Sequence, residues 1–493
     1  MRQFQIEIEN LGLGGLCKQY WKSDYATFGN RNQANAMRNM DLRNPNNIIP
    51  GPSRQRLTNG DESGVIGTLM LRIMSRAFAA NETYGVAGRN IMKLTSSVVS
   101  VDHAITDFSQ VNGKDIIEYG NKLYYVFDHS THATLGMRDA ALAYDDDFME
   151  RGAGATTGTF QLTLNVPHKL LVGGDDILYI TNGNKVSSYD DYLDVGVEDV
   201  GLDLPTDVVI TDMEWNNKKL ILTTDWPNLT GDNRTIQRIF IWNTVDEWWD
   251  DDVPQVRRSG ALYTKEGITF VFYEDITSDG GGRLGYFDGS VIKELAQFNG
   301  TLPKFYQVDE KDGFICWVSR VGSEDLIFCW GSGDPSFPAR TFQIMKGKYN
   351  TIGAIGLPFG SLIVASENES SGADNLRADL SREAGYDSDS YFYGMDYPIS
   401  LDERNAVIRK LTVDFDQLKV GAETVLKLRN SAGTEFFRKT LSYARVGRKT
   451  KKIYLMSKRA EDCRVEIDNT NGFSSTTTIV LIKKLILSGY SVR

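Results

Sequence analysis

The sequence is poor in cysteine, histidine and proline, and these shortages exclude several protein classes. Its 493 residues include only 4 Cys, 4 His and 12 Pro. Four cysteines are too few for a disulfide framework, and no two have the Cys-x-x-Cys spacing of zinc or redox sites. This usage is typical of a chain made in a reducing cytosol. Cys316 and Cys329 lie in strand-like runs on either side of Gly322, and we predict that they are neighbouring core thiols.

Long apolar segments and catalytic motifs are also missing. The N-terminus has no apolar signal-peptide core, and Lys483 and Lys484 interrupt the best apolar run, so we expect neither a signal peptide nor a membrane span. There is no GxSxG, GxxxxGK[ST] or HExxH motif. His129 and His132 follow a strand-like run, so we expect a solvated loop pair instead of metal ligands. We therefore predict a protein that is not an enzyme, with no catalytic residue, cofactor or metal site.

Acidic and aromatic clusters are present, and each has two interpretations. The acidic clusters are Asp145–Asp147, Asp190–Asp191, Asp250–Asp252 and the pair Asp275 and Asp279. None has the spacing of an EF-hand, so we expect solvated loops, with calcium coordination as the alternative. Trp248 and Trp249 are expected to pack at a sheet edge, with a sugar-stacking platform as the alternative.

Charge is distributed unevenly along the chain. The composition is ordinary for a globular protein, with 41% hydrophobic and 24% charged residues and a net charge of −11. Residues 401–493 hold 19 basic and 10 acidic side chains, a net of +9, which leaves −20 for residues 1–400. The acidic average argues against a duplex nucleic-acid binder, and the division predicts a domain boundary near residue 400.

Short apolar runs recur at a nearly constant spacing. They begin at Leu123, Ile177, Leu220, Ile268, Phe314 and Leu362, at spacings of 54, 43, 48, 46 and 48 residues. A large side chain with a turn-forming partner follows each run, at Tyr144-Asp145, Tyr189-Asp190, Trp242-Asn243, Phe287-Asp288, Trp330-Gly331 and Met395-Asp396. Small antiparallel sheets that cover each other in a ring have this pattern, and the runs are expected to be their inner strands. Unrelated hairpins in β-sandwiches are the alternative.

We therefore predict an all-β protein with three parts. Residues 1–60 form an extended N-terminal arm, residues 61–400 a β-propeller of six or seven blades, and residues 401–493 a basic β-sandwich. Six blades follow from the runs, and residues 83–94 supply a possible seventh, as an outer strand that closes the ring with an N-terminal segment. Residues 64–80 are compatible with helix or strand.

A basic cluster in the C-terminal domain is the only site that we single out. It comprises Arg445, Arg448, Lys449, Lys451, Lys452, Lys458 and Arg459. The cluster is either a solvated turn or an interface, and an acidic propeller offers it a complementary surface on another copy of the chain. Transient contact with nucleic acid is the other alternative.

The first sixty residues resemble the opening of a known family. The shared features are Gly14-Gly15-Leu16, an Ala- and Asn-rich stretch, Asn39-Met-Asp-Leu42 and Ile49-Pro-Gly-Pro52. In this respect the chain resembles virion propeller proteins of tailed bacteriophages, most of all the nozzle or tail tubular protein B-like group. The chain is more compact than many of that group and carries its extra domain at the C-terminus.

The resemblance implies a structural protein of the phage tail. It would be assembled in the host bacterial cytoplasm as a homo-oligomeric ring, expected to be a hexamer, in the nozzle, neck or baseplate. Its partners would be neighbouring tail or neck proteins, and viral DNA would pass through an acidic lumen that repels phosphate. Two alternatives stay open. One is a receptor-binding tail protein with Trp226, Trp248 and Trp249 in one glycan pocket, and the other is a propeller enzyme that degrades envelope polysaccharide with convergent carboxylates.

Overall fold

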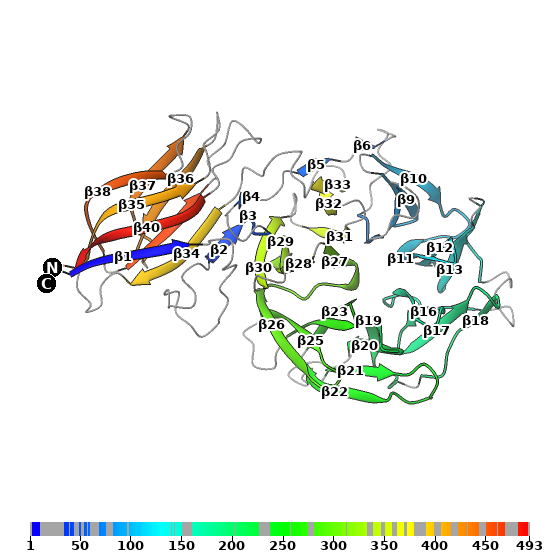
Figure 1. Cartoon of the computed structure of the whole chain (residues 1–493). Coiled ribbons are helices and arrows are strands. Elements are labelled where there is room, and N and C mark those ends of the chain that lie inside the picture. Colours follow the sequence, from blue (N-terminus) through cyan, green and yellow to red (C-terminus); the bar gives the residue numbers. More distant parts are fainter. Residues whose placement is uncertain are drawn as a thin grey trace.

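The computed structural model is built almost entirely of β-strands (Figure 1). It describes residues 2–9, 34–38, 40–43, 49–50, 54–56, 58–59, 69–74, 82–95, 98–139, 141, 143–149, 160–202, 204–225, 237–256, 258–274, 281–311, 313–332, 339–346, 351–356, 362–368, 372–378, 391–398, 406–415, 423–430, 432–442, 450–460, 462–468 and 482–491. Within these ranges the one helical element is the 3-10 turn η2, Phe305–Gln307. The all-β prediction is confirmed.

Successive antiparallel sheets follow one another along the chain and are arranged around an axis as a β-propeller (Figure 1). The first contains β7 (Arg72–Ile73), β8 (Thr83–Ala87), β9 (Asn90–Leu94) and β10 (Val98–Ala104). The next two contain β11 (Asn112–Tyr119), β12 (Lys122–Asp128), β13 (Ala133–Arg138) and β14 (Tyr144–Asp145), then β15 (Leu170–Val172), β16 (Leu178–Asn182), β17 (Lys185–Asp190) and β18 (Val195–Val197).

The remaining propeller sheets follow the same order. They contain β19 (Val209–Asn216), β20 (Lys219–Asp225), β21 (Gln237–Trp242) and β22 (Asp251–Val256); β23 (Arg258–Lys265), β24 (Ile268–Glu274), β25 (Gly281–Phe287) and β26 (Ile292–Asn299); β27 (Val308–Lys311), β28 (Phe314–Val321), β29 (Glu324–Gly331) and β30 (Arg340–Lys346); and β31 (Ile352–Gly356), β32 (Leu362–Asn368) and β33 (Gly372–Ala378).

The first strand of each sheet lies nearest the axis. Each first strand contacts the next one, in the order β7, β11, β15, β19, β23, β27 and β31. The last of them, β31, also contacts β7, so the first strands form a closed cycle. The apolar runs found in the sequence are all second strands, and the prediction that they are the inner strands is wrong. A second strand lies between two others and between two sheets, so most of its side chains are buried and its first half is an apolar run, whereas the first strands carry buried charged groups such as Asp115 and Asp212.

Turn chemistry explains three of the six members of the second sequence ladder. Asp190 is the last residue of a third strand, and Asn243 and Asp288 directly follow one; in each, the carboxylate or amide Oδ1 accepts backbone N–H groups two and three residues later. These are Asx turns, which start the connection to the fourth strand. Two members do not fit: Tyr144-Asp145 is itself a fourth strand, and Met395-Asp396 lies outside the propeller in β34 (Tyr391–Pro398).

Segments from the N-terminal region complete both neighbouring sheets where the ring closes. The strand β5 (Arg54–Arg56) pairs with β33 as the outermost strand of the last sheet. The strand β6 (Thr58–Asn59) pairs in parallel with β10 of the first sheet. Residues 83–94, predicted as an outer strand, instead form β8 and β9, the second and third strands. Of the ambiguous segment 64–80, residues 69–74 are described and contain β7.

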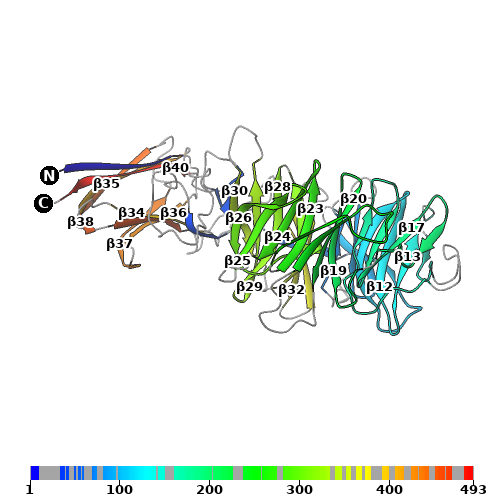
Figure 2. The same cartoon turned by 90° about the horizontal axis from the view of Figure 1, so that it is seen from below.

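Two further antiparallel sheets lie beyond the propeller, at the end that holds the N- and C-termini (Figures 1 and 2). One has the order β1 (Arg2–Glu9), β40 (Ile482–Ser491), β35 (Ala406–Phe415) and β38 (Thr450–Ala460). The other has the order β2 (Ala34–Arg38), β34, β39 (Asp462–Asp468), β36 (Glu423–Arg429) and β37 (Glu435–Ser442). Buried side chains from both, including Ile8, Leu411, Leu426 and Val465, share one core.

These sheets correct the predicted domain limits of 1–60 and 401–493. The supposed N-terminal arm supplies β1, which pairs along its whole length with β40, and β2, which pairs with β34. The strand β34 also pairs with β39, so the boundary falls between Ala378 and Tyr391. The described strands of this region pair with residues that are distant in the sequence, which local composition does not show.

A short N-terminal segment joins the two-sheet region to the propeller. Met37, Met40 and Leu42 belong to the same buried core as residues of β28 to β32. The strand β3 (Met40–Asp41) pairs with β4 (Ile49–Pro50) and also contacts β30. The buried Arg340 of β30 donates from Nε to the carbonyl of Leu42 at 2.8 Å and from Nη2 to the carbonyl of Arg43 at 2.8 Å. No helix in the described ranges is long and apolar enough to cross a membrane.

Candidate functional site: a pocket on the propeller axis

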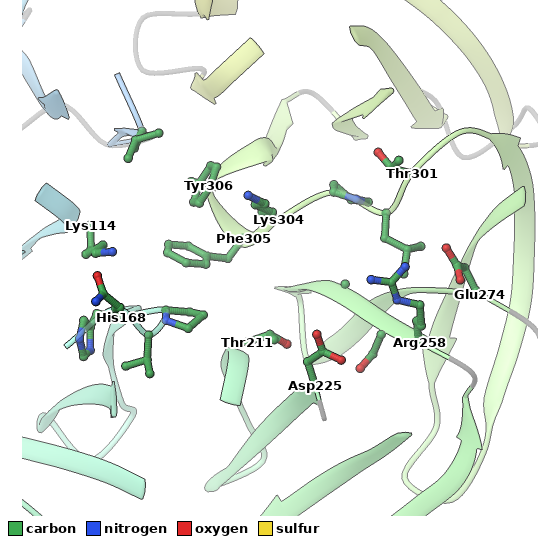
Figure 3. Close-up of a pocket in the computed structure, with 18 residues that line it drawn as sticks. Lys114, His168, Thr211, Asp225, Arg258, Glu274, Thr301, Lys304, Phe305 and Tyr306 are labelled. Carbon is green, nitrogen blue, oxygen red and sulfur yellow. The ribbon is translucent and has the colours of Figure 1, made fainter. Parts of the chain in front are cut away.

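A pocket of about 510 Å³ opens at the end of the propeller where the first strands begin. Its walls come from three connections between sheets, at residues 165–168, 258–260 and 301–306, and from the ends of β20 and β24. Figure 3 shows Phe305 and Tyr306 facing this space, with Arg258, Asp225 and Glu274 on another side of it. The volume lies within the usual range for small-molecule sites, about 300–1,000 Å³.

One aromatic ring in the pocket lining, that of Phe305, lies close to two cations. Phe305 is 7% exposed, and its ring lies 6.0 Å from the Arg72 guanidinium carbon and 5.9 Å from the Lys169 Nζ. Cations within about 6 Å of a ring face are attracted by its quadrupole. The turn η2 is fixed because Gln307 Nε2 donates to the carbonyl of Ile352 and Gln307 Oε1 accepts from the N–H of Lys304.

Beneath Phe305, each cation pairs with a buried carboxylate of the next sheet. Arg72 Nε lies 2.9 Å from Asp115 Oδ1, while Lys169 Nζ lies 2.6 Å from Asp212 Oδ1 and 2.7 Å from Glu214 Oε1. Burial raises the pKa of Asp115, and it raises the pKa of Asp212 to about 6 against the opposing effect of Lys169. Burial also tends to lower the pKa of Lys169, but Asp212 and Glu214 outweigh it, so that pKa is raised.

Each of these aspartates also ties successive sheets together. Asp115 accepts from the N–H of Leu170 at 2.8 Å, and Asp212 accepts from the N–H of Leu262 at 2.6 Å. Asp309 occupies the corresponding position on β27, and all three accept the N–H of the residue that follows them. They are 97 residues apart, which is two sheet repeats. The sequence reasoning missed this group, although the constant spacing was a readable signal.

The charged wall of the pocket contains groups of both signs. Arg258 and Glu274 are register partners on β23 and β24. Thr223 Oγ1 donates to the carbonyl of Gly260 and Ser259 Oγ to that of Thr224, so Asp225 lies next along β20, beside Arg258. Within the described part of the chain, Arg258 and Glu274 take part in no ion pair or side-chain hydrogen bond. The arrangement is therefore open to a ligand with hydroxyl or amide groups.

The histidines have structural roles in this structure. The ring nitrogens of His168, which lines the pocket, lie 2.7 Å from the Thr181 carbonyl and 2.9 Å from the Thr163 carbonyl, and burial lowers its pKa. His129 and His132 sit in one turn with rings 4.1 Å apart, but His129 is buried, which corrects the expectation of a solvated pair. Among the described residues, no group of three or more His, Cys, Asp or Glu side chains is placed to hold a metal ion.

The acidic clusters differ in their surroundings. Asp146 is buried and accepts from the Tyr125 hydroxyl at 2.6 Å, so the expectation of a solvated loop is wrong there. Asp190 and Asp191 lie in a turn but are half-buried, and Asp191 is paired with Lys122, whereas Asp250 is exposed and precedes β22. Asp275 and Asp279 lie outside the described residues. Three turns, at residues 173–177, 190–195 and 243–251, contain nine carboxylates and no Lys or Arg; we call them the acidic face. Turns alternate between the two ends of an antiparallel sheet, which puts the acidic face at the propeller end opposite the pocket.

The two tryptophans belong to the acidic face. Trp249 packs against Phe240 with ring centroids 5.0 Å apart, in agreement with the packing interpretation, while Trp248 is 62% exposed. Neither lines the axial pocket, and Trp226 lies outside the described residues. The two thiols are placed as predicted: Cys316 and Cys329 are register partners and both are buried, with Sγ atoms 3.0 Å apart.

The predicted basic cluster is only partly described. Arg445, Arg448 and Lys449 lie outside the described residues. Lys451, Lys452, Lys458 and Arg459 lie on β38, at the edge of its sheet. Lys452 is exposed, and the neighbouring Tyr454 is 76% exposed. Lysine on an edge strand is one means by which natural proteins prevent indiscriminate strand pairing.

Comparisons with known proteins find solved structures that are only distantly similar to the chain. No family model and no curated protein matches the chain. Among solved structures, the chain is similar to "YCF48 bound to D1 peptide", with 9% identity and a TM-score of 0.42 over 70% of this chain and 97% of that one. It is also similar to the β-propeller domain of the Trilobed protease from Pyrococcus furiosus, with 11% identity and a TM-score of 0.41 over 63% and 96%. A third is an exo-β-1,3-galactanase from Phanerochaete chrysosporium, with 9% identity and a TM-score of 0.26 over 76% and 95%. We draw no functional conclusion from similarities this low.

Proposed function

We propose that the protein is a non-enzymatic structural component of a tailed-phage virion, which assembles head to tail into a ring in the tail. In this proposal the closed cycle of first strands corresponds to seven blades, and the two terminal sheets form a β-sandwich. The observation that carries it is the separation of an acidic, partly apolar surface from a basic one. The tail location rests on the resemblance of the first sixty residues.

The acidic face keeps an excess of carboxylates, which suits a cationic partner, although Lys122 pairs with Asp191 and Lys219 pairs with Asp250. Its turns expose apolar side chains among the carboxylates: Tyr192 is 93% exposed, and Leu193, Val245 and Trp248 are also exposed. Tyr179 connects two of these turns, because it donates from its hydroxyl to Asp175 Oδ2 at 2.7 Å and Thr244 also contacts it. Large side chains exposed together in one charged region mark interaction sites.

The strand β38 has the complementary composition. It belongs to a region with a net charge of +9 and presents Lys452 and Tyr454 on the outermost of the described strands of its sheet. One copy of the chain carries both surfaces, the acidic face on the propeller and β38 in the two-sheet region beyond it (Figure 2). A contact between unlike surfaces of identical chains is heterologous, and it produces a ring where the rotation closes.

Mixing two variants tests the head-to-tail contact. The first, Tyr192→Ser with Glu247→Lys, disables the acidic face; the second, Lys452→Glu with Tyr454→Ser, disables the β38 edge. We expect wild type to form salt-sensitive oligomers in analytical ultracentrifugation, and each variant alone to be monomeric. An equimolar mixture should give a dimer and nothing larger, because each pair has one intact contact.

The control variant is Lys304→Glu, at the pocket end of the propeller, which should leave the oligomer unchanged. A wild-type chain that stays monomeric at all concentrations, or a mixture that yields no dimer, would count against the assembly. The tail assignment is tested separately by cryo-electron microscopy of a particle that contains the chain, and a location outside the tail would overturn it without affecting the contact.

A propeller enzyme acting on polysaccharide is the second candidate, because Asp225 and Glu274 both line the axial pocket. Glycoside hydrolysis uses two carboxyl groups across the scissile bond. Release of reducing sugar from envelope polysaccharide, lost in both Asp225→Asn and Glu274→Gln, would establish this candidate in place of the non-enzymatic one.

A further inference from the structure

We propose that the axial pocket binds a neutral saccharide. This inference goes beyond assembly, because it concerns the propeller end opposite the acidic face. It also differs from the glycan site expected at Trp226, Trp248 and Trp249, since none of those residues lines this pocket.

The charged groups that line the pocket are of both signs, and this favours a neutral ligand over an ion. The lining contains the carboxylates of Asp225 and Glu274 and the cations Lys114, Arg258 and Lys304. Lys114 is paired with Asp128 at 2.7 Å. An ion of either sign would meet a group of its own charge in this lining, whereas a neutral ligand with hydroxyl groups can hydrogen-bond to both kinds.

The polar groups in the wall suit vicinal hydroxyls. Carboxylates accept hydrogen bonds on two oxygens, and a guanidinium donates from a planar fork. Glu274 and Arg258 are register partners on neighbouring strands. Within the described chain neither side chain takes part in an ion pair or a side-chain hydrogen bond. A sugar ring that offers adjacent O–H groups can donate to Glu274 and accept from Arg258 at the same time.

The aromatic side of the pocket suits the C–H face of a pyranose ring. Tyr306 is half-buried and lies next to Phe305, with ring centroids 5.0 Å apart at an interplanar angle of 78°. Lys304 Nζ lies 5.6 Å from the Tyr306 centroid, so that ring has a charged neighbour as well. An aromatic surface opposite planar polar groups matches a ligand that has one apolar face and a hydroxyl rim.

The loop that carries these aromatics is held in place before any ligand binds. Ala261 N–H donates to the Pro303 carbonyl, and Thr301 N–H donates to the Arg320 carbonyl, both at 3.0 Å. The loop approaches β23 so closely at Gly260 that a Cβ there would lie 2.7 Å from the Pro303 oxygen. A preformed site loses less entropy on binding.

Calorimetry with a panel of neutral tri- to hexasaccharides of glucose, galactose and mannose tests the proposal on the full-length protein. We expect at least one to bind, with an affinity that is nearly independent of salt. Tyr306→Ala and Glu274→Gln should each weaken it about tenfold or more, since each removes one of the two recognition surfaces. Tyr192→Ala, on the acidic face, is the matched control and should bind as wild type does.

Three results would overturn the proposal. They are no binding by any member of the panel, binding that Tyr306→Ala and Glu274→Gln leave unchanged, or a preference for charged peptides that disappears at high salt. Circular dichroism of the variants separates a lost site from a lost fold. The oligomeric state of Tyr306→Ala should remain that of wild type, so failure here and failure of the assembly are distinguishable.

Discussion

Replacing Lys169 by Met should destabilise the propeller strongly, because this lysine neutralises two carboxylates on the axis. Lys169 is 5% exposed, and its Nζ lies close to Asp212, Glu214 and the Phe305 ring. Removing one partner of a buried ion pair leaves an uncompensated charge, which typically costs about 3–5 kcal/mol. We expect a loss of that size in the free energy of unfolding at pH 8.

Lys265→Met is the matched control for Lys169→Met. Lys265 also joins one first strand to the next, with its Nζ 2.5 Å from Glu310 Oε1, but both side chains are partly exposed. An exposed pair contributes about 0–1 kcal/mol. Urea denaturation followed by tryptophan fluorescence should therefore separate the two variants by about 2 kcal/mol or more.

The loss in Lys169→Met should also depend on pH. The folded-state pKa of Asp212 is already raised to about 6, and removing Lys169 raises it further. A carboxyl whose pKa is higher in the folded protein destabilises the fold above that pKa, and this penalty disappears as the pH falls towards its unfolded value. The deficit should shrink between pH 8 and pH 5. A cost below about 1 kcal/mol, or one that is the same at both pH values, would refute this account of the axis.

Three further predictions concern other parts of the molecule. Gly260→Ala should cost about 1–3 kcal/mol in chemical denaturation and weaken saccharide binding, because its Cβ would displace the Pro303 backbone; wild-type stability would contradict the close approach. Burial lowers the pKa of His168, so the wild-type protein should lose stability as the pH falls below about 6.5, and His168→Gln should lose less. Thermal melts from pH 7 to pH 5 measure both, and identical pH profiles of the two proteins would contradict this role of His168. Arg340→Met should cost about 2–3 kcal/mol in urea denaturation, because it leaves the Leu42 and Arg43 carbonyls without their charged donor, and a cost below 1 kcal/mol would mean that the junction does not depend on this side chain.

The second strands were predictable from the sequence because burial on both faces makes them continuous apolar runs. The first strands were not, since Asp115 and Asp212 read as ordinary polar residues until the pairing with Arg72 and Lys169 is known. A periodic search for single charged residues at twice the sheet repeat would have found them.

The role of the N-terminal residues was out of reach for a different reason. Residues 2–9 pair with residues 484–491, and residues 54–56 pair with residues 376–378. Local composition does not indicate which distant strands a segment pairs with. An Asn-rich stretch without apolar runs, considered alone, therefore has the composition of an extended arm. The pocket likewise depends on three connecting loops that meet only once the ring is closed.

The pairing of β1 with β40 has a consequence for synthesis on the ribosome. At about 5–20 residues per second, β1 waits roughly 25–100 s after its own translation before its partner strand exists. Throughout that time its hydrogen-bonding edge is unpaired, as is that of β5 until β33 has been made. The chain cannot fold to completion co-translationally, so chaperone capture of the nascent N-terminal segment, or pairing between neighbouring nascent chains, competes with correct closure.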